Sequence, residues 1–282
     1  MLIDDLKIIV DRNRGQNSFY LRNLLKEVLQ IYSLNFVYTS VYADSFLFKG
    51  GTCLRFCFDL PRLSEDLDFD IKKYPDFSLD NFCGDIKAYF VGKLQFREFD
   101  LKVAGNKREI VLKFPVMDKL GLVSNTAESN ILFLRIDLSP TDSENFKEEI
   151  SLKTTYDFSF VIKRYSIEDL FASKIAAILN RSFKKGKGDL ITFKGRDYYD
   201  LIWFLEKGVN PNYKRLTDIV KMKSKNEILE KLDEKVGSVK ENYLKEDLLP
   251  LFKEAGLVDS FVVNFKQLYK QKRDLLLPDF SI

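Results

Sequence analysis

Histidine is absent from the 282 residues of this chain, and cysteine is scarce, with three residues. Without an imidazole, Ser-His-Asp triads, papain-type Cys-His dyads and His-ligated zinc hydrolase sites are excluded. Cys53 and Cys57 lie four residues apart without further ligands nearby, so we expect small buried side chains rather than a zinc site. The scarcity of cysteine, with acidic Asp4 and Asp5 where a signal peptide would be basic, predicts a cytoplasmic protein.

Long apolar runs and a strong charge imbalance are also missing. The longest stretch without a charged residue, Val28 to Ala43, is 16 residues and contains polar side chains, whereas a membrane span needs about 20 apolar residues. The 45 Lys and Arg against 42 Asp and Glu leave +3, too little to indicate a nucleic-acid partner from total charge. With 13 Gly, 7 Pro and 45% hydrophobic residues, the composition is that of a folded chain of one large or two modest domains.

The spacing of apolar residues changes character near residue 165. Before it, helical and alternating patterns are interspersed, which predicts an α/β (α+β) domain with a mixed sheet over residues 1–165. After it, only helical spacing remains, which predicts an all-α helical bundle domain over residues 166–282. We expect helices at 2–10, 19–38, 77–94, 167–181, 196–206, 213–222, 225–236, 243–255 and 261–277, and strands at 46–48, 64–71, 96–103, 109–117, 131–138 and 157–162.

Acidic residues alternate with apolar ones from Asp66 to Ile71. On a strand, this alternation buries one face and places the carboxylates on the other. Asp66 and Asp68, about 7 Å apart at Cα on such a strand, are within reach of a shared divalent ion. Taken alone, an acidic strand is more often a solvated edge.

A glycine pair, Gly50-Gly51, follows the short apolar run 46–48 and precedes Thr52. Free backbone N–H groups at a glycine turn that opens a helix can bind phosphate oxygens, and the Thr52 hydroxyl can add to them. Taken alone, Gly-Gly is a common loop sequence.

Together the two features resemble a known pattern. Gly-Gly-Thr, thirteen residues and then Asp-Leu-Asp resembles the signature of the DNA polymerase β-like nucleotidyltransferase superfamily. The fuller strings Lys49-Gly-Gly-Thr-Cys-Leu-Arg55 and Arg62-Leu-Ser-Glu-Asp-Leu-Asp-Phe-Asp70 resemble the AbiEii/AbiGii-type toxins of bacterial toxin–antitoxin and phage-defence systems. Three later motifs of that family also have counterparts here: Arg135-Ile-Asp137, Lys174-x-x-Ala-x-x-x-Arg181 and Arg196-Asp197-x-x-Asp200.

The resemblance implies a Mg²⁺-dependent nucleotidyltransferase that uses a nucleoside triphosphate, modifies an acceptor such as the 3′ end of tRNA or another RNA, and has a cognate antitoxin protein. It implies that Asp66, Asp68 and Asp137 bind two Mg²⁺ ions and act with Lys174 in catalysis. The implied nucleotide-binding residues are Gly50, Gly51, Thr52, Ser64, Lys174, Arg181, Arg196, Asp197 and Asp200. Asp70 is expected to be structural.

Several alternatives stay open at this point. Lys174 and Arg181, nearly two helical turns apart, share a helix face, yet both can be ordinary solvated charges. The basic loop containing Lys184, Lys185, Lys187 and Lys194 either binds an RNA backbone or is a solvated surface. The chain as a whole can be a catalytically idle nucleotide- or RNA-binding regulator. An aminoglycoside-type nucleotidyltransferase would not account for the third and fourth motifs.

Overall fold

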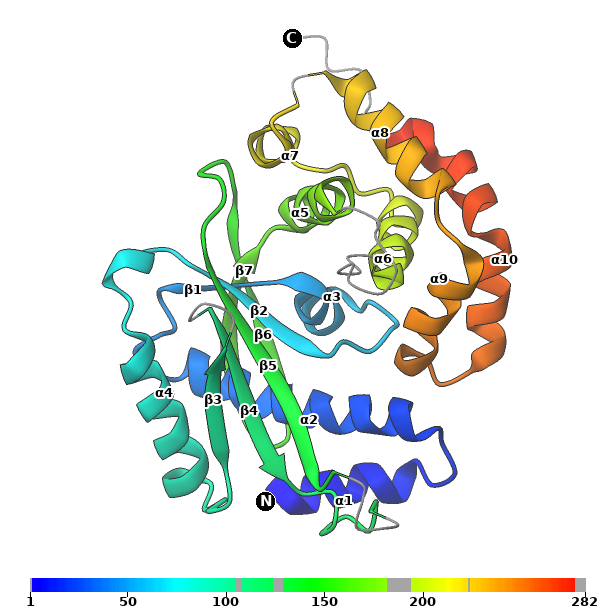
Figure 1. The fold of residues 1–282 in the computed structure, drawn as a ribbon. Helices are drawn as coiled ribbons and strands as arrows, with labels where there is room; N and C mark the ends of the chain where they lie inside the picture. The colour runs from blue at the N-terminus through cyan, green and yellow to red at the C-terminus, as the bar shows by residue number, and fades with distance from the viewer. Residues whose placement is uncertain (1, 105–107, 124–128, 182–193, 223, 277–282) are drawn as a thin grey trace. The chain divides into compact units, whose positions relative to one another are not determined.

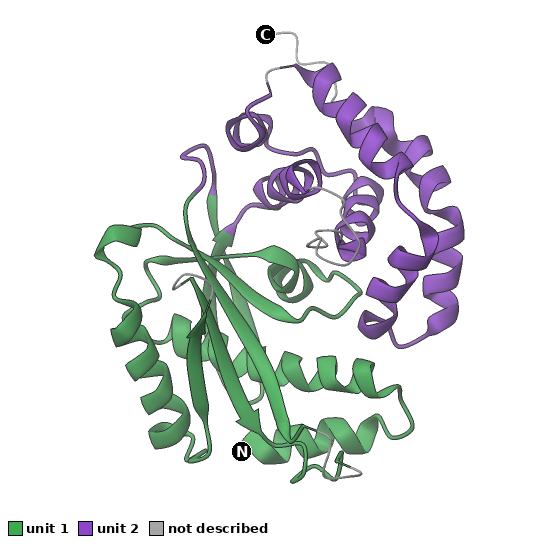
Figure 2. Ribbon diagram, viewed as in Figure 1, with its two compact units in different colours: residues 1–141, 148–164 green, residues 142–147, 165–282 purple. Residues whose placement is uncertain are grey.

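The computed structural model describes residues 2–104, 108–123, 129–181, 194–222 and 224–276 (Figure 1). The chain divides into two compact units (Figure 2). Unit 1 comprises residues Met1–Thr141 and Glu148–Arg164, and unit 2 comprises Asp142–Lys147 and Tyr165–Ile282. Within the described residues, no helix combines the length and the apolar character needed to cross a membrane.

Unit 1 is built on a seven-stranded sheet of order β3-β4-β5-β2-β1-β7-β6. Strand β2 is antiparallel to β1 and parallel to β5, and β1 is parallel to β7. The prediction of a mixed sheet is therefore confirmed. The strands are β1 (Phe46–Lys49), β2 (Asp66–Ile71), β3 (Asp100–Ala104), β4 (Glu109–Pro115), β5 (Ile131–Pro140), β6 (Glu148–Thr155) and β7 (Phe158–Tyr165).

One strand, β6, was not predicted. Its apolar residues alternate as in other strands, but Ile150 and Leu152 are 65% and 71% exposed, and its remaining residues are polar or charged. The sequence pattern therefore lacks the hydrophobic content that marks a strand with one buried face.

The helices of unit 1 supply most of its core. Helix α2 begins at Asn17, whose side chain accepts hydrogen bonds from the backbone N–H groups of Phe19 and Tyr20, and its second half is buried throughout. Phe46 of β1 stacks on Phe82 at 5.2 Å between ring centroids. The helices are α1 (Leu2–Arg12), α2 (Ser18–Tyr38), α3 (Gly50–Phe58) and α4 (Leu79–Ala88), with short turns η1 (Tyr74–Asp76) and η2 (Tyr89–Lys93).

The regular elements described in unit 2 beyond Ser166 are helices. The first begins where the Ser166 hydroxyl caps the N–H of Asp169, and its Phe171 ring stacks on Phe204 at 4.3 Å. They are α5 (Ile167–Asn180), α6 (Gly195–Glu206), α7 (Tyr213–Val220), α8 (Lys225–Gly237), α9 (Glu241–Leu248) and α10 (Ala255–Lys272), with η3 (Leu249–Leu251) and η4 (Arg273–Leu276).

The last two predicted helices have wrong limits. The expected helix 243–255 ends at Leu248, and α10 starts at Ala255 rather than near Phe261. Pro250 explains the first difference, because proline lacks the N–H that an α-helix interior needs. The chain forms the 3₁₀ turn η3 there instead.

Candidate active site

Three predicted acidic residues lie on one face of the unit 1 sheet. Asp68 of β2 is directly opposite Asp137 of the parallel strand β5, and Asp66 precedes Asp68 on the same face. All three are partly exposed, whereas Leu67 and Ile136 between them are buried. The strand register thus brings together residues separated by about 70 positions in the chain.

The same register places two charged residues beside this group that the sequence analysis did not assign. Lys49 lies opposite Asp68 on β1, and Glu109 lies opposite Asp137 on β4. The row across the sheet therefore reads Lys49, Asp68, Asp137, Glu109. Lys49 begins one of the motif strings, but only the strand register shows that it lies opposite Asp68 and that Glu109 lies opposite Asp137.

Lys49 also contacts the third acid of β2. Its Nζ lies 2.5 Å from Oδ1 of Asp70, whose side chain is fully buried. A buried carboxylate needs such a partner. This ion pair gives Asp70 a structural contact, in keeping with the role expected for it.

The donor set suits a hard divalent cation, since Mg²⁺ prefers oxygen ligands and is held by one or two carboxylates together with substrate phosphates. The described residues contain no group of three or more Asp, Glu, Cys or His side chains placed to hold a metal ion by themselves. Asp68 and Asp137, adjacent across the strands, are instead a two-carboxylate arrangement that substrate oxygens could complete. Mutual repulsion of like charges on neighbouring strands also favours a cation there.

Gly50 and Gly51 open α3 directly after β1. Gly50 has φ +76°, and a Cβ at this position would lie 2.7 Å from Cγ of Asp68. Lys49, the N-cap residue, supplies no side-chain hydrogen bond to the first turn. The helix N-terminus therefore lies against Asp68, and its first N–H groups are not capped by the Lys49 side chain, which is the geometry that accommodates phosphate oxygens.

Thr52 and Ser64 lie beneath this turn. Thr52 is fully buried, and its hydroxyl donates a hydrogen bond to the backbone carbonyl of Asp66. A Cβ on Gly51 would lie 2.9 Å from Oγ of Ser64 and 2.7 Å from a guanidinium nitrogen of the buried Arg62. Thr52 thus links the start of α3 to strand β2. Arg62 is a close neighbour of Gly51, and the sequence analysis assigned it no role.

A second group of predicted residues lies in unit 2. Nζ of Lys174 on α5 is 2.8 Å from Oδ1 of Asp197 and 2.8 Å from Oδ2 of Asp200, both on α6. Arg181 also forms an ion pair with Asp197. Asp200 is fully buried and Asp197 nearly so. Arg181 is the extended C-cap residue of α5, and it and Lys174 both contact Asp197, so that two acids compensate their two charges.

Other residues at the start of α6 have structural contacts within unit 2. The backbone N–H of Arg196 donates to Oδ2 of Asp247 at 3.0 Å. Tyr198 and Tyr199 pack edge-on or tilted against aromatic rings of the same unit, at 4.9–5.8 Å between centroids. Lys194 is exposed, whereas Lys184, Lys185 and Lys187 lie outside the described residues.

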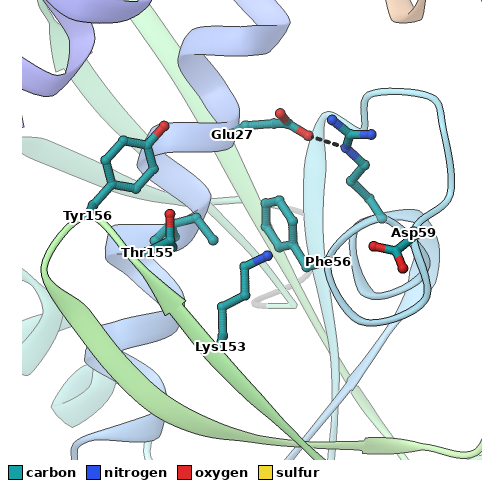
Figure 3. Close-up of a pocket in the computed structure, with 8 residues that line it drawn as sticks. Glu27, Phe56, Asp59, Lys153, Thr155 and Tyr156 are labelled. Carbon is teal, nitrogen blue, oxygen red and sulfur yellow. Dashed lines mark hydrogen bonds and ion pairs between the residues drawn. The ribbon is translucent and has the colours of Figure 1, made fainter.

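Unit 1 also contains a pocket of about 320 Å³ that involves none of the predicted site residues. Figure 3 shows Lys153 of β6 extending toward Phe56 of α3, with its Nζ 5.1 Å from the ring centroid. Arg55 donates to Glu27 at 2.6 Å on the same wall. The lining mixes both signs of charge with aromatic rings; it consists of Glu27, Ile31, Arg55, Phe56, Asp59, Lys153, Thr155 and Tyr156.

The fold has counterparts among solved structures. The structure resembles that of MenT4, a nucleotidyltransferase toxin of Mycobacterium tuberculosis H37Rv, with a TM-score of 0.59 and 15% identity over 98% of this chain and 91% of that one. JHP933 from Helicobacter pylori aligns with a TM-score of 0.49 and 15% identity over 90% of this chain and 93% of its own. No curated protein matches the sequence significantly.

An acidic strand beside a glycine-initiated helix on a mixed sheet is the arrangement of a nucleotidyltransferase, and the fold agrees with that class. Residues 35–266 match the family described as nucleotidyl transferase AbiEii toxin of type IV toxin–antitoxin systems. The chain belongs to this family, as its motifs indicated. It is therefore an enzyme that transfers nucleotides, and the interpretation as an idle regulator loses its support.

Proposed function

We propose that this enzyme transfers a nucleotidyl group from a nucleoside triphosphate to an RNA hydroxyl, such as the 3′ end of tRNA, and that this reaction makes it a toxin. The observation that carries the proposal is the placement of Asp66, Asp68 and Asp137 on one sheet face, beside the first turn of α3. The carboxylates favour cations, and the N–H groups at the start of a helix favour phosphate oxygens, so the two sets of groups suit a metal-bound triphosphate.

In the proposed reaction, the acceptor hydroxyl oxygen attacks the α-phosphorus in line. The bond from the α-phosphorus to the bridging oxygen breaks, and pyrophosphate leaves. Asp66, Asp68 and Asp137 would hold two Mg²⁺ ions, which when bound stabilise the negative charge that develops on the phosphate oxygens. Asp137 accepts the hydroxyl proton, while the N–H groups of Gly50 and Gly51 bind the β- and γ-phosphates.

Thr52 and Ser64 pack against the first turn of α3, and the Thr52 hydroxyl holds the Asp66 backbone through its hydrogen bond to the carbonyl. For unit 2 we propose that the cluster of Lys174, Arg181, Asp197 and Asp200, with Arg196, contributes to nucleotide binding. The two acids hold the Lys174 ammonium in one position, and an ammonium held in this way needs no reorganisation when a phosphate approaches.

We further propose that residues 1–165 are the nucleotidyltransferase domain and residues 166–282 a helical bundle domain. A tRNA-modifying toxin acts in the cytoplasm, where its substrate is found, and the family implies a separately encoded antitoxin. A role in phage defence follows from the same system type.

The proposal is tested by incubating the purified protein with Mg²⁺, total tRNA and each of the four labelled nucleotides in turn. We expect label transfer by the wild type, with one nucleotide preferred. Asp68→Asn should abolish transfer, because it removes a charge from the acidic pair while preserving shape and hydrogen-bonding capacity. Its circular dichroism spectrum should be unchanged, since the loss of a like charge next to Asp137 does not destabilise the strand.

Asp76→Asn is the matched control, because Asp76 is an exposed carboxylate shortly after the same strand. It should transfer label like the wild type. Label transfer by Asp68→Asn at the wild-type rate would remove the acidic pair from the chemistry, and an unfolded Asp68→Asn protein would assign these acids to structure.

A further inference from the structure

Strand β6 is one of the two edge strands of the seven-stranded sheet, at the end opposite to β3. An edge strand presents backbone N–H and C=O groups that another strand can pair with. The centre of its exposed face is apolar, because Ile150 and Leu152 are 65% and 71% exposed, and Val161 of the neighbouring β7 is 46% exposed. Natural edge strands usually carry charged or shielded residues at such positions, so this edge is well suited to a partner.

The turn that follows β6 establishes which backbone groups point outward. Tyr156 and Asp157 both have positive φ, 49° and 61°, as in a two-residue type I′ hairpin, whose flanking residues Thr155 and Phe158 form a hydrogen-bonded pair. The contact between Thr154 and Ser159 hydroxyls at 3.2 Å agrees with this register. Alternation along an antiparallel pair then directs the N–H and C=O groups of the even-numbered residues 148, 150, 152 and 154 away from β7.

The sequence of β6 is complementary to itself when reversed. Its central residues read Glu149-Ile150-Ser151-Leu152-Lys153. If a second copy pairs antiparallel about Ser151, Ile150 lies opposite Leu152 of the other copy, and Glu149 lies opposite Lys153. This register also pairs even-numbered residues with even-numbered residues, so the outward-pointing backbone groups of both strands meet.

The charges on the opposite face favour the same register. Glu149 and Lys153 are both partly exposed, and in the part of the chain that the structure describes Lys153 makes no ion pair, its contact being the Phe56 ring. Glu149 is paired with Arg164 at 2.9 Å. Pairing about residue 150 or 152 instead would place Glu149 or Lys153 opposite an uncharged residue. Among these registers, all of which pair even-numbered residues with even-numbered residues, only pairing about Ser151 places Glu149 opposite Lys153, and it does so twice.

We propose that two copies of this chain associate through their β6 strands, antiparallel and centred on Ser151, to form one continuous sheet. The interface is isologous, since each contact occurs twice about the two-fold axis. Ile150 and Leu152 of both copies form an apolar row flanked by the two Val161 side chains. This inference does not depend on the proposed reaction, because the catalytic carboxylates lie on β2 and β5.

Sedimentation velocity of the full chain over a range of concentrations tests the association. The wild type should form a dimer. Leu152→Lys should shift the chain to monomer, whereas Val263→Lys, at a position on α10 with a similar exposed fraction of 72%, should not. A wild type that stays monomeric at every concentration, or a Leu152→Lys protein that dimerises as well as the wild type, would overturn the proposal.

Charge reversal tests the register. Glu149→Lys and Lys153→Glu should each weaken the dimer about tenfold, because each places like charges opposite each other twice. Mixing the two variants should restore dimers, since each lysine then faces a glutamate. A folding role for Glu149 would not produce this recovery. A mixture that dimerises no better than its components would defeat the register.

Ser151→Cys gives an answer that does not depend on the charged residues. The two-fold axis brings the Cα atoms at position 151 to about 4.5 Å, within the range of a disulfide. The Cys57 thiol contacts the Ser151 hydroxyl, so both cysteine variants are made in a Cys57→Ser background, in which mild oxidation of Ser151→Cys should yield a covalent dimer. Thr154→Cys, opposite Glu148 of the other copy, should yield no more than the wild type with its three native cysteines. Equal yields for the two variants would refute pairing about Ser151.

Discussion

Gly50 links the backbone of unit 1 to the chemistry of its site. Its φ of +76° lies in the left-handed region, which glycine adopts without the steric cost that a Cβ brings. In addition, any Cβ would overlap the Asp68 carboxylate. A glycine is therefore required here for two separate reasons, and the second reason concerns the acid on which the reaction depends.

Gly15 allows the two reasons to be separated, because it has φ +81° but no atom within 4 Å of the place that a Cβ would occupy. We expect Gly15→Ala to lower the free energy of unfolding by about 1–2 kcal/mol, the cost of a left-handed L-residue. Gly50→Ala should lower it further and also abolish label transfer, because Asp68 must move. Urea unfolding and the transfer assay measure the two effects. Full transfer activity in Gly50→Ala would show that the site tolerates displacement of Asp68.

At the residue scale, sequence reasoning placed the acids and glycines that the structure brings together. It had no means of identifying Lys49 and Glu109 as their neighbours, since both depend on strand register. Thr52 is predicted to bind phosphate, and the motif gave no sign that its hydroxyl also donates a hydrogen bond to the Asp66 carbonyl. A motif specifies residue types at a spacing, and the direction of a hydroxyl is decided by packing.

At the element scale, α5 and α6 are joined by the ion pairs of Lys174 with Asp197 and Asp200. Asp200 is fully buried and the Lys174 side chain is 12% exposed. Removing one partner of a buried pair leaves an uncompensated charge, which costs more than the pair itself contributes. The cluster therefore stabilises unit 2 whatever its role toward nucleotides.

We expect Lys174→Ala to lower the free energy of unfolding by about 3–5 kcal/mol and to remove growth arrest when expressed. Lys245→Ala is the control, because Lys245 pairs with Asp259 at 2.5 Å where both side chains are 44–51% exposed, and an exposed pair is worth about 0–1 kcal/mol. Chemical denaturation of both variants gives the comparison. A loss below about 1 kcal/mol in Lys174→Ala would show that the buried acids do not need the lysine for stability. If growth arrest were still lost, the substitution would act on nucleotide binding and not on folding.

Strands and helices differed in how well their sequences predicted them. Strands with a buried face, such as β2 and β5, follow the alternation of apolar residues and were predicted within about two residues. Strand β6 was missed because its apolar residues face outward. Helix ends depended on local chemistry: Ser166 starts α5 as a cap, whereas the consequence of Pro250 for α9 was overlooked.

At the scale of the whole molecule, the absence of histidine affects how the free energy of unfolding depends on pH. No side chain has an ordinary pKa between about 5 and 8 when histidine is absent. Hydrogen bonds from Arg273 hold the pKa of Asp233 below its usual value, and hydrogen bonds from Ser143 and Asn145 do the same for Asp218. Burial raises the pKa of Tyr198, and also that of Tyr32, where a hydrogen bond to Asp5 adds to the effect.

These directions determine the expected stability curve. A carboxyl group whose pKa is lower in the folded state stabilises the protein above its unfolded pKa of about 3.9, and this contribution is lost as the pH falls through the folded value. A buried tyrosine with a raised pKa disfavours folding once the pH exceeds about 10, where the unfolded phenol loses its proton first.

We therefore expect the free energy of unfolding to be nearly constant from about pH 6 to 8, to fall below about pH 4 and to fall again above about pH 10. Urea unfolding across this range measures it. A stability change with a midpoint near about pH 6.5 would contradict the account, because it would require a buried carboxyl or thiol to titrate where this chain has no histidine.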